Sequence, residues 1–120
     1  MKKTLLVLLF SFVSLFAFEE LNPNNFQEKT SKGKVIVDFH SPYWGSCKIL
    51  GKNLQKYNDT SKAKDVKIYK LNVNDYDKIA GNYSLIGVPA VLYFNDGKIV
   101  FKHLGVLSVS QLESLQKEHF

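Results

Sequence analysis

The chain has 120 residues, of which 45% are hydrophobic and 22% are charged, and it contains one cysteine. This length fits a single domain, and the hydrophobic content excludes disorder of the whole chain. One cysteine excludes an intramolecular disulfide, a Cys-x-x-Cys redox pair and a multi-thiolate zinc site. All 16 basic side chains are lysines, which argues against specific nucleic-acid binding, because arginine is the better residue for recognising phosphates and bases with paired hydrogen bonds.

The chain opens with a basic and then an apolar stretch. Lys2 and Lys3 precede an apolar run that ends at Glu19. This pattern is typical of a secretory signal peptide, and the run is shorter than the roughly 20 residues needed to span a membrane comfortably. We therefore expect a signal peptide over residues 1–17, with cleavage after Ala17.

The remaining residues, 18–120, are predicted to form one domain that is periplasmic or otherwise exported. Leu15, three positions before the expected cleavage site, is larger than the small residue preferred there, which leaves open an uncleaved first segment. Contact with a membrane is expected only if that segment stays uncleaved. Cys47 has no partner in its own chain, and the domain must therefore be held together by its core alone. We expect a monomer without a cofactor.

The first half of the domain is predicted to contain a short helix in a polar stretch, then an apolar strand and a longer helix. The short helix is expected after Asn24 or Asn25, with its end at Gly33, and the β-branched run over residues 35–39 predicts a buried strand. Small residues and a proline over 41–46 then break the chain. Beyond them, the apolar stripe of a helix is marked by Cys47, Leu50, Leu54 and Tyr57.

The sequence of the second half of the domain predicts three strands and two helices. In chain order these are a strand over 66–73, a short helix over 75–81, strands over 90–94 and 98–104, and a helix from 108 onward. Asn95-Asp96-Gly97 is typical of a hairpin turn, and Ser108-x-x-Gln111 is the pattern of a helix capping box. The order predicts an α/β domain of three layers, with a central mixed β-sheet flanked by helices.

Three motifs resemble the thioredoxin family. Residues 35–48 are similar to the family's first buried strand, active-site loop and helix start. Gly87-Val88-Pro89-Ala90 looks like the cis-proline loop, and Asn95-Asp96-Gly97-Lys98 looks like the hairpin that follows it. The motifs occur in the family's order and spacing, and the match spans essentially the whole domain, so the resemblance implies the thioredoxin fold and a cis peptide bond before Pro89.

The active-site motif departs from the family at one decisive position. The loop reads Trp44-Gly45-Ser46-Cys47, so Trp44 replaces the first cysteine of Cys-x-x-Cys and Cys47 is aligned with the second. In the family the first cysteine is the exposed nucleophile, and the second resolves the mixed disulfide. Without the first sulfur, this chain alone cannot cycle between dithiol and disulfide.

The candidate catalytic residues are Cys47, Asp38 and Lys70. The helix dipole at Cys47 would lower a thiol pKa and favour an exchange centre, whereas its place in the apolar stripe favours a partly buried small hydrophobe. By resemblance, Asp38 matches the family's buried acid and Lys70 its partner lysine. The alternative is a structural ion pair, because a buried carboxylate needs compensation. His40 is either a base beside the thiol or a packed, hydrogen-bonded side chain.

The candidate substrate-binding residues are Tyr43, Trp44, Val88 and Pro89. By resemblance they border a groove that holds extended peptides, and an exposed Trp44 would serve as an anchor there. The alternative is that Trp44 folds down and fills the gap left by the lost sulfur. Cys47 and His40 supply at most two ligands, so no metal site is expected.

Three functions remain open from the sequence. The first is binding or capture of extended peptides or thiol-containing envelope proteins. The second is an enzyme, a monothiol disulfide-exchange catalyst that uses Cys47 in envelope redox homeostasis. The third is a structural or assembly role in which Cys47 is inert.

Overall fold

The computed structural model describes residues 18–120. The predicted signal peptide over residues 1–17 lies outside the described residues and stays a prediction. Within the described range, no helix is both long enough and apolar enough to cross a bilayer.

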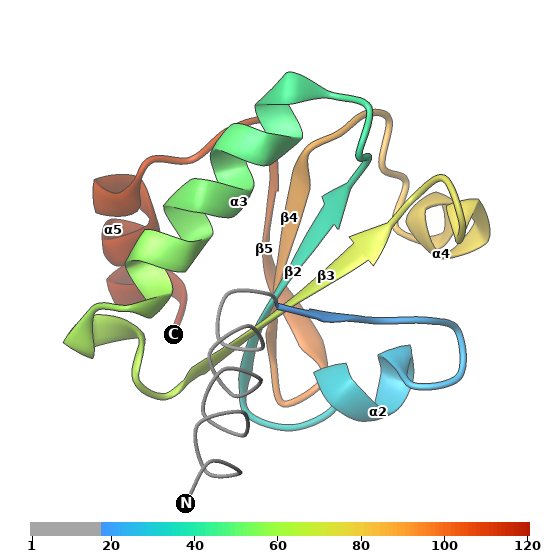
Figure 1. The fold of residues 1–120 in the computed structure, drawn as a ribbon. Helices are drawn as coiled ribbons and strands as arrows, with labels where there is room; N and C mark the ends of the chain where they lie inside the picture. Colours follow the sequence, from blue (N-terminus) through green and yellow to red (C-terminus); the bar gives the residue numbers. More distant parts are fainter. Residues whose placement is uncertain (1–17) are drawn as a thin grey trace, which may run out of the picture.

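One mixed sheet forms the centre of the domain, with the strand order β1-β3-β2-β4-β5 (Figure 1). The strands are β1 (Glu19–Glu20), β2 (Lys34–His40), β3 (Val66–Asn72), β4 (Ala90–Asn95) and β5 (Lys98–Leu104). β1, β3 and β2 run parallel, whereas β4 is antiparallel to β2 and β5 is antiparallel to β4. The long helix between β2 and β3 provides the crossover that a parallel pair requires.

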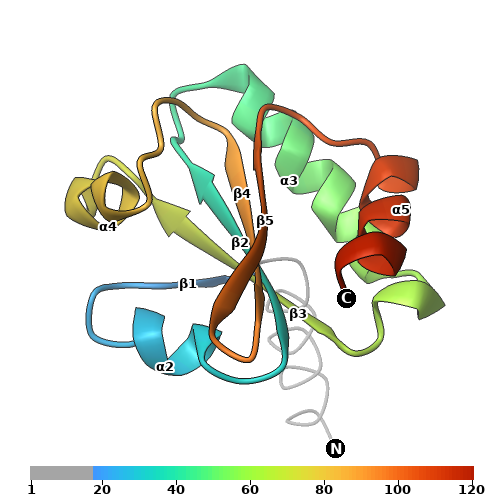
Figure 2. The ribbon, with the colours of Figure 1, turned by 180° about the vertical axis from the view of Figure 1, so that it is seen from behind.

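Helices cover both faces of this sheet. They are α2 (Phe26–Thr30), α3 (Gly45–Asn58), the 3-10 turn η2 (Ser61–Ala63), α4 (Asp77–Asn82) and α5 (Val109–His119). α3 and α5 lie on one face, and α2 and α4 lie on the other, as both views show (Figures 1 and 2). The predicted three-layer α/β architecture is confirmed.

The buried strand β2 explains how the two halves of the core are joined. Its residues from Val35 to Phe39 are all buried, because helices cover the sheet on both sides. Val37 and Phe39 belong to the cluster on the α2 and α4 side, and Ile36 belongs to the cluster on the α3 and α5 side. Asp38 is the one charged side chain within this run.

Local signals for turns and caps are confirmed, and one strand was missed. Asp96 and Gly97 have φ of 49° and 85°, as a tight hairpin turn requires. The backbone N–H of Gln111 donates to the Ser108 hydroxyl, and the N–H of Ser108 donates to the Gln111 side chain. β1 was not predicted, because two consecutive glutamates are too short to show a strand pattern.

Candidate functional site

Three loops meet at the end of the sheet where β2 and β3 finish. They are the β2–α3 loop, the β3–α4 loop and the segment that leads into β4, and they gather between the start of α3 and α4 (Figure 1). A cavity of about 420 Å³ lies there. Its lining consists of Ser41, Trp44, Val73, Asn74, Ala80, Leu85, Ile86, Gly87 and Val88. We call this cavity the groove.

Two of the predicted substrate-binding residues line the groove, namely Trp44 and Val88. Trp44 is 59% exposed, so it does not fill the space of the lost sulfur. Tyr43 is 83% exposed on the same loop and stands outside the lining, while Pro89 is buried. The peptide bond between Val88 and Pro89 is cis, as the resemblance implied.

Cys47 lies in the first turn of α3 and is 5% exposed. The backbone N–H of Ser41 donates to its sulfur, with 3.5 Å between N and Sγ. Burial raises the pKa of the thiol above its ordinary value, the Ser41 N–H opposes this, and the nearby Asp38 raises it further. Burial thus outweighs the Ser41 N–H, and because the thiol pKa lies above its ordinary value, Cys47 is a buried, protonated thiol at neutral pH.

Asp38 is 3% exposed, and among residues 18–120 its Oδ1 atom has no hydrogen-bond partner. Burial raises the pKa of this carboxyl from 3.8 to about 7, with Lys70 acting to lower it and Glu20 acting to raise it. Lys70 is the register partner of Asp38 on β3. Within the described part of the chain, however, no ion pair within 4.0 Å joins the two side chains.

Three charged residues, Glu20, Lys70 and Asp38, lie side by side on the adjacent strands β1, β3 and β2. Lys70 and Asp38 were predicted from the sequence as site residues, but Glu20 was not. Glu20 pairs with Lys70 in register, and Lys70 pairs with Asp38. Glu20 also reaches His40, with 2.7 Å between Oε1 and Nε2. His40 therefore has a carboxylate partner on β1 instead of acting as a free base beside the thiol. The only sequence signal for Glu20 was its position just after the apolar run.

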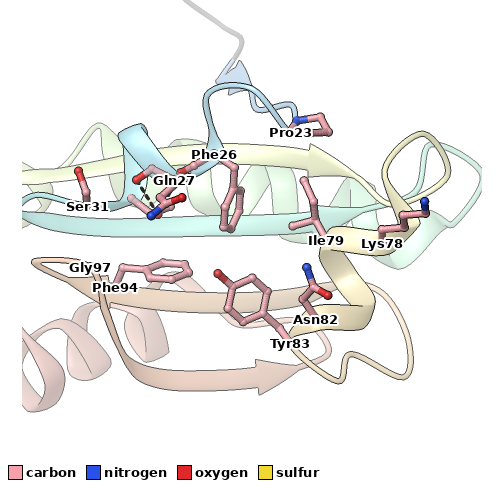
Figure 3. A pocket seen from close by; sticks show the side chains of 11 residues that line it. Pro23, Phe26, Gln27, Ser31, Lys78, Ile79, Asn82, Tyr83, Phe94 and Gly97 are labelled. Carbon is pink, nitrogen blue, oxygen red and sulfur yellow. Dashed lines mark hydrogen bonds between the residues drawn. The ribbon is translucent and has the colours of Figure 1, made fainter.

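A second, larger cavity of about 630 Å³ lies between α2 and α4 (Figure 3). Phe26, Tyr83 and Phe94 form its floor, and their ring centroids are 5.7–6.0 Å apart. None of the predicted site residues lines it, and neither Cys47 nor Asp38 borders it. The candidate site is therefore the groove, which is lined by Trp44 and Val88.

No cluster of three or more histidine, cysteine, aspartate or glutamate side chains suited to a metal ion occurs among the residues that the structure describes. Asp38 and His40 lie on β2, and Glu20, which is hydrogen-bonded to His40, lies on β1. The chemistry available at this end of the sheet is that of one buried thiol, one buried acid and an exposed apolar surface.

A mixed five-stranded sheet, helices on both faces and a cis-proline beside the first turn of α3 define a protein of the thioredoxin fold with a single buried thiol. The sequence model of the Thioredoxin family matches residues 17–118. Mitochondrial thioredoxin of Mus musculus is 34% identical over 108 residues, which cover 88% of this chain and 64% of the mouse protein. Thioredoxin of Bacillus subtilis is 29% identical over 103 residues, which cover 86% of this chain and 98% of that protein.

Solved structures agree on the fold. Oxidised mitochondrial thioredoxin 3 of Saccharomyces cerevisiae superposes with a TM-score of 0.76 at 24% identity, covering 88% of this chain and 98% of that one. Thioredoxin of Malassezia sympodialis gives a TM-score of 0.76 at 24% identity, covering 85% of this chain and 92% of that one. The chain belongs to the thioredoxin family, although it spans less than two thirds of the mouse relative.

Proposed function

We propose that this protein binds extended segments of other exported proteins in the groove and carries out no dithiol chemistry. The observation that carries the proposal is the groove itself, about 420 Å³ in volume, with an exposed Trp44 on its rim. Ile86, which is 91% exposed and also lines the groove, adds to its apolar surface. Large exposed apolar side chains beside a cavity are typical of binding anchors.

The chemistry of the loop favours binding over catalysis. The position that would hold the attacking sulfur holds an indole, and the remaining sulfur is buried and protonated. A thiol is a poor nucleophile compared with a thiolate. What the loop presents to a partner is therefore apolar surface. The pattern of residues 1–17 supports export, so we place the partners in the cell envelope.

The test removes the anchor and keeps the fold. The probe is a protein whose disulfides have been reduced and whose thiols have been carboxymethylated, so that it is unfolded and has every thiol blocked. Binding of this probe to the folded domain is measured by calorimetry. Because a central aromatic anchor contributes about 2 kcal/mol or more, Trp44→Ala is expected to weaken binding by at least about tenfold. Ile49→Ala is the matched control, since Ile49 is 55% exposed on α3 and does not line the groove.

Equal binding by the wild type and by Trp44→Ala would contradict the proposal. If neither Trp44→Ala nor Cys47→Ser changed binding, and the only effect of each were on stability, the structural role with an inert Cys47 would be favoured.

Asp38 supports a second candidate, a monothiol exchange reaction. Its carboxyl has a pKa of about 7 and lies close enough to Cys47 to raise the thiol pKa, so as a carboxylate it is a suitable acceptor for the thiol proton. The Cys47 thiolate would attack a disulfide R–S–S–R′, form Cys47–S–S–R and release R′–S⁻, which takes up a proton. No net oxidation is required, because one disulfide is exchanged for another.

Glutathione disulfide is the probe for this reaction. Mass spectrometry of the folded domain would show a glutathione adduct on Cys47, formed more slowly in Asp38→Asn at about pH 8, where the wild-type carboxyl is ionised. Cys47→Ser is the blank. Absence of an adduct in the folded wild type, together with an adduct in the urea-unfolded protein, would eliminate this candidate.

A further inference from the structure

The exposed side of α3 carries three lysines, Lys48, Lys52 and Lys56. Residues four apart lie on one side of a helix, so these side chains form a basic stripe about 12 Å long. None of them lies within 4.0 Å of a carboxylate among residues 18–120. We call these three residues the lysine stripe.

The lysine stripe begins at the groove. Trp44 is the N-cap residue of α3 and also lines the groove, and Lys48 lies in the next turn of the same helix. A segment that contacts Trp44 and continues over the start of α3 would therefore meet the stripe. The helix runs away from the three loops, so the positive charge extends outward from one side of the groove (Figure 1).

The opposite flank carries negative charge. Asp75 and Asp77 are exposed, and they follow Asn74, which lines the groove, at the start of α4. Neither has an ion-pair partner within 4.0 Å in the described part of the chain. Lys78 of the same helix lines the α2–α4 cavity instead (Figure 3). The groove thus lies between a basic side and an acidic side.

We propose that the groove selects a protein segment with acidic residues at the end that lies over α3, and that it binds this segment in one orientation. This inference rests on the proposed peptide binding. Charge complementarity across an interface sets the orientation and suppresses the wrong partner more than it adds raw affinity. An anionic membrane is the other surface that exposed lysines and a tryptophan suit, but Asp75 and Asp77 at the same end of the molecule would be repelled by it.

The test uses two synthetic peptides with the same apolar centre. One has glutamates before the centre and lysines after it, and the other has these two halves exchanged. Trp44 is the only tryptophan of the chain, so its fluorescence reports binding at the groove directly. We expect one peptide to bind roughly three- to tenfold more tightly than the other at low salt, a preference that decreases as salt screens the charges.

Charge reversal on the stripe gives the decisive comparison. In Lys52→Glu/Lys56→Glu both sides of the groove are acidic, so the preference between the two peptides is expected to be nearly abolished. Lys64→Glu/Lys67→Glu makes the same change in net charge near the start of β3, at the far end of that strand from the groove, and is expected to leave the preference unchanged.

The outcomes separate this inference from the proposed function. Equal binding of both peptides by the wild type would overturn the orientation proposal and leave peptide binding standing, whereas binding of neither would overturn both. A preference that survives reversal of the stripe would also refute the inference. Binding to vesicles of anionic phospholipid that is tighter than binding to either peptide would assign the stripe to a membrane and overturn the proposal.

Discussion

Asp38→Asn is expected to stabilise the protein at high pH and to leave its stability unchanged in acid. The carboxyl is buried, and its pKa is raised from 3.8 to about 7. The native state therefore holds a proton that the unfolded state has released between about pH 4 and pH 7, and stability falls as the pH rises through this interval. Three powers of ten in the acid constant, at about 1.4 kcal/mol each, give a loss of about 4 kcal/mol. Asparagine has nearly the same shape and never ionises.

Urea unfolding followed by far-UV circular dichroism measures this difference. At about pH 9 the variant should exceed the wild type by about 2–4 kcal/mol, and at about pH 4 the two should agree within about 0.5 kcal/mol. The lower end of the range allows for relaxation around the charge. Lys70→Met is the companion variant, because removing the charge that lowers the Asp38 pKa should move the loss of stability to higher pH. A pH-independent difference between Asp38→Asn and wild type would refute the reasoning.

Three further predictions follow from burial, spacing and capping. Cys47, 5% exposed and with a raised pKa, should react with iodoacetamide at about pH 7 at least about tenfold more slowly in the folded protein than in urea; equal rates would contradict its burial. Trp44→Cys should introduce disulfide reductase activity toward insulin, because the Cys47 N–H donates to the Trp44 carbonyl across one helical turn, a spacing that suits a disulfide; a folded variant with no activity would refute this. Ser108→Ala should lower the free energy of unfolding by about 1 kcal/mol through loss of the cap on α5, while Ser114→Ala, exposed on the same helix, should change it by less than about 0.5 kcal/mol.

The elements that the sequence predicts well are those with strong local signals. The buried run in β2, the Asp96-Gly97 turn and the Ser108 cap each depend on a few neighbouring residues, and each is present in the structure. β1 could not be predicted, because its two residues acquire their conformation by pairing with β3, about fifty positions away along the chain. Short pairings of this kind depend on tertiary contacts and leave almost no local pattern.

At the candidate site, too, the features with a local sequence signal were predicted, and those that depend on tertiary contacts were not. The sequence and the family resemblance located Trp44 and Val88, which line the groove, and Cys47, which proved to be buried. They did not reveal the partner of His40, because Glu20 reaches it only through the register of β1. The balance between the helix dipole and burial at Cys47 also required the structure, since the degree of burial depends on the loops around the thiol.

Asp38 connects the stability of this protein to the question of its chemistry. A buried carboxyl without a hydrogen-bond partner on Oδ1 lowers the stability of the native state increasingly from about pH 4 to about pH 7, and Lys70 offsets only part of that effect. In a dithiol protein such an acid would have a proton-transfer role at the second cysteine. Here the same role exists only if Cys47 exchanges with a disulfide. If Asp38→Asn raises stability and leaves the glutathione adduct of Cys47 unchanged, the acid contributes to neither function nor stability, and binding at the groove accounts for the site. If the adduct forms more slowly in that variant, the destabilising carboxyl has a chemical use, and the exchange reaction becomes the better account.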